Sequence, residues 1–323
     1  QRQICIRDRS VTFSLPGMLL VSLLAFFLLP ACGPGSCGGG GGVGDGGGGG
    51  GGGVQPQPVN TFSPRLFILG SEITPDDKLH IYAHGLDAAG NTISLNDFRT
   101  NSVVTIDGTI RLDNGADVNG GGVTVQAIPD GSPISLGFLT DYSFSIDDAG
   151  LVEIGQLYEQ VLNTLPAGFE AQVLNFSDDT VVRQEWTGDL PTLLDAVQFD
   201  PGMPRNNTAF YDGIGSSLYR DDEVDGFGLS ERGRAVCMLI SYTDGVDNAS
   251  FIYDKGDLLN RIDVSRTVAI MLGTQAADTA ELNEFAGSRG AFAYAFDVDG
   301  LSQAFLEWTT SLGTIVEFVI EAN

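Results

Sequence analysis

The segment Val236–Gly245 reads VCMLISYTDG, and it is the stretch that decides the fold. Its first eight residues carry no charge, which predicts a strand buried on both faces, as is typical of parallel sheets. The strand then passes directly into Asp244 and Gly245. Because open parallel sheets bind ligands at the carboxyl ends of their strands, we expect Asp244 to belong to a binding site.

The segments around this strand alternate between strand-like and helix-like patterns. The expected strands are 170–176, 234–241, 266–272 and 291–296, with a hairpin partner near 180–182, and the expected helices are 151–165, 190–197, 208–218, 279–285 and 301–312. Strands joined through helices need right-handed crossovers, which produce a mostly parallel sheet with helices on both faces. We therefore predict an α/β, Rossmann-like domain over residues 138–312.

Two further polar residues follow apolar segments in this domain. Asp147 comes after the alternating run Tyr142–Ile146, and Thr208 lies in the loop Asn206–Asp212. We expect Asp147, Thr208 and Asp244 to converge at the carboxyl edge of the sheet. Oxygen side chains are the ligands that Mg²⁺ and Ca²⁺ prefer, so the three residues are candidate metal ligands.

This order of residues resembles a von Willebrand factor type A domain. In that family a strand ends in Asp-x-Ser-x-Ser, and these side chains bind one divalent cation together with a later Thr and the Asp of a Thr-Asp-Gly turn. A remaining coordination position takes a carboxylate of a partner. The resemblance implies a protein-interaction module of the adhesion type, with Mg²⁺ or Ca²⁺ as the cofactor.

If the motif begins at Asp147, Ala149 and Leu151 occupy its two serine positions. The site is then degenerate, and two alternatives stay open. One is a weakened cation site completed by water, and the other is a metal-free domain that serves as a structural envelope tether or assembly component.

A small antiparallel β domain is expected over residues 60–137. Short alternating runs such as 78–83 and 102–106 are separated by turn signals at 87–91, 107–108, 113–115 and 119–122. The succession from Asp87 to Gly108 resembles the immunoglobulin-like segment that precedes type A domains in bacterial surface proteins. The last segment, 313–323, contains the strand-like run TIVEFVI, and we expect it to return to the sheet of the β domain.

The first residues have the pattern of an export signal. Arg2, Arg7 and Arg9 precede an apolar run from Val11 to Leu29, and the following LPAC resembles a bacterial lipobox that ends at Cys32. We expect cleavage after residue 31, acylation of Cys32, and a glycine-rich tether over 32–59. A plain transmembrane anchor is the alternative. Either anchor predicts that the bulk of the chain lies outside the cytoplasmic membrane, in the bacterial cell envelope. With the lipid anchor, Gly33 stands where an Asp would indicate retention at the inner membrane, so we expect the outer membrane or cell surface.

Composition excludes several other functions. The chain has 42 acidic and 16 basic residues and a formal charge of −26, which argues against a nucleic-acid partner. No glycine-rich phosphate loop follows a strand, so no nucleotide is expected. The two histidines, His80 and His84, fall in the β domain, where we expect them on an exposed strand face. The α/β domain thus has no histidine that could act as a general base, and we predict that the protein is not an enzyme.

Overall fold

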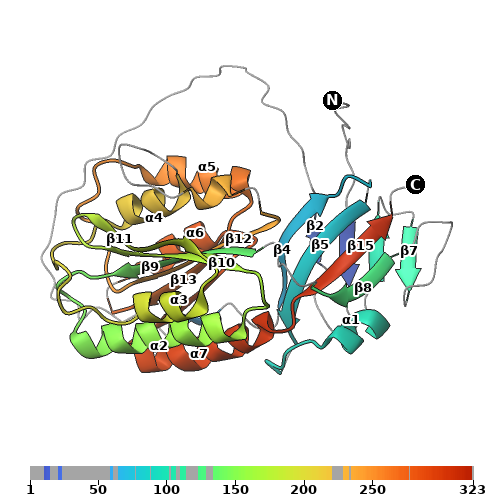
Figure 1. The fold of residues 1–323 in the computed structure, drawn as a ribbon, viewed down its shortest axis with the longest axis horizontal. Coiled ribbons are helices and arrows are strands. Elements are labelled where there is room, and N and C mark those ends of the chain that lie inside the picture. Colours follow the sequence, from blue (N-terminus) through green and yellow to red (C-terminus); the bar gives the residue numbers. More distant parts are fainter. Residues whose placement is uncertain are drawn as a thin grey trace, which may run out of the picture.

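The computed structural model describes residues 11–14, 21–23, 59–60 and 65–321, apart from gaps at 77, 88, 102, 107–109, 114–122, 129–133, 220–227, 233 and 276. The predicted lipid site Cys32 and nearly all of the tether 32–59 lie outside these residues. Figure 1 shows an α/β part and, beside it, a part made mainly of antiparallel strands.

The α/β part is built on five parallel strands in the order β10-β9-β12-β13-β14. Their bounds are Glu170–Phe176, Ile134–Asp141, Val236–Thr243, Val268–Thr274 and Ala291–Ala295. Strand β11 (Thr180–Thr187) is antiparallel to β10 at one edge, and β3 (Val59–Asn60) is antiparallel to β14 at the other. The α/β class with a central, mostly parallel sheet is thus confirmed, although β9 begins at Ile134, before the domain boundary expected at 138.

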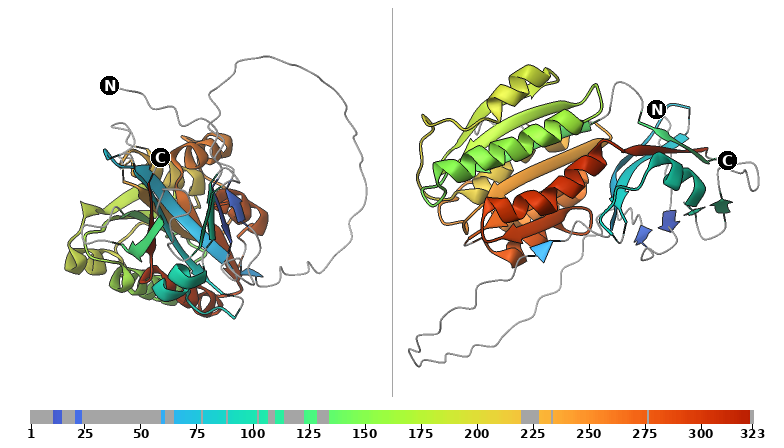
Figure 2. Two further views of the ribbon diagram at one scale, coloured as in Figure 1. Left: turned by 90° about the vertical axis from the view of Figure 1, so that its right-hand side faces the viewer. Right: turned by 90° about the horizontal axis from the view of Figure 1, so that it is seen from below.

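Helices cover both faces of this sheet (Figure 1). One hydrophobic core with the strands is shared by α2 (Asp148–Thr164), α3 (Leu190–Ala196) and α7 (Val298–Leu312). A second core with the strands is shared by α4 (Phe210–Leu218), α5 (Lys255–Ser265), α6 (Thr279–Ala286) and a 3-10 turn at Leu229–Glu231. Figure 2 shows α2 and α7 side by side over the first face. The alternation of strand and helix in the sequence therefore gives a three-layer arrangement.

Five of the helices begin after an aspartate. The side chains of Asp147, Asp189, Asp254, Asp278 and Asp297 each accept a backbone N–H of the first helical turn. An N-cap carboxylate satisfies one of the free N–H groups of that turn and also complements the helix dipole. These five aspartates therefore have a structural role at the starts of helices.

An antiparallel sheet adjoins the amino-terminal ends of the parallel strands. Its order is β4-β5-β15-β8, with the bounds Arg65–Ile73, Lys78–Leu86, Val316–Glu321 and Val123–Ala127. Helix α1 (Leu95–Asn101) packs on one face through Phe98, and the register pair Val236↔Gly70 joins β4 to β12. The last strand, expected to return to the β domain, lies between β5 and β8. An immunoglobulin-like arrangement stays a prediction.

A second small sheet contains two strands from the segment predicted to be a signal peptide. Its order is β2-β1-β6-β7, with the bounds Val21–Leu23, Val11–Ser14, Val103–Ile106 and Ile110–Asp113. Cleavage after residue 31 would remove β1 and β2 and leave β6 paired with β7 alone. No helix in the described part of the chain is long and apolar enough to cross a membrane.

His84 differs from the exposed strand histidine that the sequence predicted. It is fully buried where β5 meets α7, with its ring stacked on Phe67 at 4.9 Å and edge-on to Trp308 at 5.7 Å. Nδ1 lies 2.6 Å from the hydroxyl of Ser311, and burial lowers the pKa of His84 to about 3. The neutral imidazole is therefore part of the contact between the two parts of the chain.

Candidate functional site

The first part of the site follows the end of strand β9. The strand ends at Asp141, and the next residues turn away from the sheet, with the N–H of Tyr142 bonded to the carbonyl of Phe176 at 2.7 Å. The sequence from Asp141 reads DYSFS, so Ser143 and Ser145 follow the strand at alternate positions. An Asp-x-Ser-x-Ser pattern thus lies at the carboxyl edge of the sheet.

The second part comes from the end of β12, the neighbouring strand. A carboxylate oxygen of Asp244, Oδ1, accepts the hydroxyl of Ser145 at 2.8 Å and that of Ser143 at 3.5 Å, and the two hydroxyl oxygens are 3.0 Å apart. Asp141 accepts the backbone N–H of Ser143 at 2.8 Å and the hydroxyl of Thr243 at 2.7 Å. These contacts gather two carboxylates and two serine hydroxyls from adjacent strands.

Thr208 supplies a third hydroxyl from the loop before α4. Its backbone N–H donates to the side-chain oxygen of Asn248 at 3.0 Å, and the N–H of Asn248 donates to the Thr208 carbonyl at 2.9 Å. A Cβ placed on Gly245 would lie 3.3 Å from Thr208 Oγ1, so this hydroxyl sits directly beside the residue that follows Asp244. Thr208 thus lies beside the residue that follows Asp244.

Burial makes the two carboxylates of this cluster unusual. Asp141 is 0% and Asp244 is 1% exposed. Burial raises the pKa of Asp141 to about 7, with a smaller contribution from the charge of Asp244, and burial also raises the pKa of Asp244. The second carboxylate oxygen of Asp244, Oδ2, is buried without a hydrogen-bond partner among the described residues. Such an atom is costly unless another group satisfies it.

The donor set fits a hard divalent cation. Asp141, Ser143, Ser145, Thr208 and Asp244 offer only carboxylate and hydroxyl oxygens, which suit Mg²⁺ or Ca²⁺ better than a softer metal. A cation would also satisfy the orphaned oxygen of Asp244. In the part of the chain that the structure describes, no three His, Cys, Asp or Glu side chains are grouped to hold a metal, and this cluster itself combines two carboxylates with hydroxyls.

Asp147, the remaining metal candidate from the sequence, has a different place. It is the N-cap of α2, where its Oδ1 accepts the N–H of Gly150 at 2.7 Å. Ala149 and Leu151 lie inside the helix, and Leu151 is buried in the core. The motif was thus assigned six residues too late, and the hydroxyls that seemed to be missing come from the serines after Asp141. The argument for a degenerate site loses its basis.

The spacing at Asp141 was visible in the sequence. The run Tyr142–Ile146 alternates apolar and polar residues, which is typical of a strand, so the strand was expected to continue to Asp147. The signal for the site is the literal pattern Asp-x-Ser-x-Ser, which Asp141, Ser143 and Ser145 form in the sequence.

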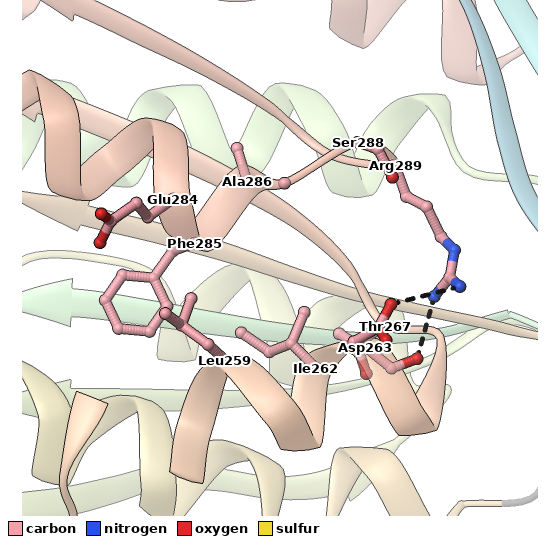
Figure 3. A pocket seen from close by; sticks show the side chains of 10 residues that line it. Leu259, Ile262, Asp263, Thr267, Glu284, Phe285, Ala286, Ser288 and Arg289 are labelled. Carbon is pink, nitrogen blue, oxygen red and sulfur yellow. Dashed lines mark hydrogen bonds and ion pairs between the residues drawn. The ribbon is translucent and has the colours of Figure 1, made fainter. Parts of the chain in front are cut away.

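A hollow near the amino-terminal ends of β13 and β14 does not share these features. It lies between the carboxyl-terminal ends of α5 and α6, with Leu259, Ile262 and Phe285 among its lining residues (Figure 3). Arg289 borders it and contacts Asp263, with its guanidinium 3.2 Å from the Asp263 carbonyl and 3.6 Å from its carboxylate. The hollow has an apolar floor and one ion pair, and it does not gather oxygen ligands.

Comparison with known proteins shows the fold. No protein-family model and no curated protein matches the chain. A solved structure of proximal thread matrix protein 1 from the mussel byssus, with a zinc-occupied MIDAS motif, is similar at 16% identity and a TM-score of 0.50, covering 62% of this chain and 50% of that one. The chain thus spans about half the length of the mussel protein.

Two bacterial structures are also similar. One is a von Willebrand factor type A structure from Catenulispora acidiphila, at 14% identity and a TM-score of 0.47, covering 80% of this chain and 51% of that one. The other is the conserved hypothetical protein BatB from Bacteroides thetaiotaomicron, at 14% identity and a TM-score of 0.40, covering 56% and 98%. The α/β part of the chain has the von Willebrand factor type A fold.

Proposed function

We propose that this chain is a protein-interaction module of the adhesion type that works through a divalent cation held by Asp141, Ser143, Ser145, Thr208 and Asp244. The observation that carries the proposal is the buried, unpaired Oδ2 of Asp244 beside a second buried carboxylate and three hydroxyls. Two carboxylates in a site with little water are strongly disfavoured unless a positive charge neutralises them. Mg²⁺ or Ca²⁺ would supply that charge.

The protein residues of the site have separate tasks in this proposal. Ser143 N–H and the Thr243 hydroxyl hold the carboxylate of Asp141, and the Ser145 hydroxyl orients that of Asp244. When bound, the cation would act as a Lewis acid that accepts a further oxygen ligand from outside the protein. A carboxylate of a partner protein has the right charge for that position.

The site lies at the end of the α/β part that is turned away from the antiparallel sheet. The antiparallel sheet adjoins the amino-terminal end of β12, through Val236 and Gly70, whereas Asp244 follows the other end of that strand. We propose on the sequence evidence that the anchor is a lipid on Cys32 and that the protein is located in the bacterial cell envelope.

Calorimetric titration of the full chain with Mg²⁺, Mn²⁺ and Ca²⁺ tests the proposal. We expect saturable binding that Asp141→Asn and Asp244→Asn abolish. Asp147→Ala is the matched control, because it removes an aspartate next to the site that caps a helix, and it should retain binding. The assignment is refuted if Asp147→Ala abolishes binding while Asp141→Asn does not. It is also refuted if the wild type gives no binding heat at millimolar metal. That second outcome would favour the alternative, a metal-free structural tether.

A further inference from the structure

Exposed apolar side chains lie in the loops that carry the five-oxygen site. Phe144 is 73% exposed and lies between the two site serines, and Phe251 is 79% exposed in the loop that follows Asp244. The same loop carries Val246 at 48% and Ile252 at 45%. We call Phe144, Val246, Phe251 and Ile252 the apolar rim. A group of exposed large apolar side chains is characteristic of a binding surface.

The backbone beneath the rim is firmly held. The carboxylate of Asp212, only 3% exposed, accepts the N–H groups of Phe251, Ile252 and Tyr253, each at 3.0 Å. This buried anion fixes the turn that presents Phe251 to solvent. A side chain held out by a rigid backbone loses little entropy on binding, which is what an interface anchor requires.

Both rim loops are also bonded to the segment that carries Thr208. The N–H of Phe144 donates to the carbonyl of Asn206 at 2.9 Å, and the N–H of Asn248 donates to the carbonyl of Thr208 at 2.9 Å. The rim and the oxygen cluster therefore rest on the same backbone, so one partner can contact both.

The loops around the rim are acidic. Besides the buried Asp244, the segments 142–147, 177–179, 198–209 and 244–254 hold six aspartates, of which Asp200 is ion-paired with Arg183, and a single basic residue, Arg205. Arg205 is already ion-paired with Asp148 at 2.8 Å. A partner that covers this surface should therefore be basic, because a second acidic surface would be repelled. The formal charge of −26 makes a second copy of this chain or an anionic lipid surface a poor occupant for the same reason.

We propose that the apolar rim docks a protein segment that has apolar residues on both sides of one carboxylate and basic residues further out. The apolar residues would pack on Phe144 and Phe251, and the basic residues would face the aspartates of the surrounding loops. The role of the carboxylate rests on the proposed function, whereas the roles of the apolar and basic residues do not.

A blocked synthetic peptide with the sequence KKLDLKK tests the inference. Its affinity for the full chain is measured by calorimetry with saturating Mg²⁺, beside three analogues in which Asn replaces the Asp, Ser replaces both Leu, or Glu replaces the Lys residues. We expect each replacement to weaken binding by about tenfold or more, since burial of apolar groups, charge pairing and metal ligation contribute separately.

The protein variants separate the rim from the oxygen cluster. Phe251→Ser should lower the affinity for the parent peptide about tenfold, while the affinity for Mg²⁺ stays unchanged. Val264→Ser is the matched control, because Val264 is 68% exposed on α5 at the other edge of the sheet and should not matter. The rim proposal is overturned if the parent peptide does not bind at millimolar concentration, or if Phe251→Ser binds it as the wild type does.

Failure of the metal site would be recognised separately. The proposed function fails if Mg²⁺ does not bind and the Asn analogue binds as tightly as the parent peptide. The rim proposal still stands in that case if the peptide binds the wild type and Phe251→Ser binds it more weakly.

Discussion

Protonation of His84 should weaken the folded state at mildly acidic pH. Its imidazole is enclosed by Phe67, Trp308 and Ser311, without a carboxylate hydrogen-bonded to it in the described structure. Burial lowers the pKa of His84 from 6.5 to about 3. Between these two values the unfolded chain binds a proton that the folded chain excludes, so stability falls as the pH is lowered through this window and is unaffected by His84 above it.

The size of the effect follows from the width of the window. Each pH unit below 6.5 costs about 1.4 kcal/mol for a group whose folded form stays neutral. Lowering the pH from 7.5 to 4.5 crosses about two such units, so His84 should reduce the free energy of unfolding by about 3 kcal/mol. That is a large fraction of the stability of a typical domain.

Urea unfolding of the wild type and of His84→Gln at pH 7.5, 5.5 and 4.5 measures this contribution. The difference between the two proteins cancels other titrating groups, among them Asp141, whose raised pKa acts in the opposite direction. A Trp186→Phe background leaves Trp308, which touches the His84 ring, as the single tryptophan reporter. The wild type should lose about 3 kcal/mol more than His84→Gln. Equal losses would show that His84 binds a proton as readily in the folded chain as in the unfolded chain, which would refute the lowered pKa.

Two further predictions concern aspartates that hold backbone N–H groups near the site. Asp147→Ala should lower the free energy of unfolding by about 1 kcal/mol, because α2 loses its N-cap. Tm should then fall by a few degrees, and Asp147→Ser should largely restore it. An unchanged Tm would contradict the capping role. Asp212→Ala removes the acceptor of three N–H groups, so it should lower the free energy of unfolding in urea by about 3 kcal/mol. Amide exchange at residues 251–253 should be faster in this variant than in Asp254→Ala. Equal exchange in the two variants would refute the role of Asp212 in holding this turn.

Most of the α/β architecture was predictable from local patterns. Apolar runs predicted β10, β12, β13 and β14, and the spacing of Leu151, Ile154, Tyr158 and Val161 predicted α2, because continuous burial and a one-sided apolar stripe are properties of single segments. Strand β9 was not among the expected strands. Helix α5 was not expected. Its buried residues are only Leu258 and Ile262, so it has a short apolar stripe and depends on its neighbours for its stability.

The site was only partly predictable for a related reason. Thr208 and Asp244 were identified from loops after buried segments, but Asp141 was hidden because the residues after it alternate like a strand. The pairing of β9 ends with Asp141 opposite Phe176 and with Thr140 opposite Tyr242. Tyr142 N–H still bonds to the Phe176 carbonyl, but Phe144 N–H bonds to Asn206 outside the sheet, where the chain has turned into the loop that carries Ser143 and Ser145.

The sequence by itself determined the type and order of most strands and helices, β9 and α5 excepted, together with the acidity of the chain and the roles expected of Thr208 and Asp244, since these depend on each segment alone. Tertiary structure decided where β9 ends, that Asp147 caps a helix while Asp141 faces Asp244, and that His84 is buried. Each of these depends on which distant segment lies alongside, because hydrogen-bond partners and burial come from neighbours that only the folded chain brings together.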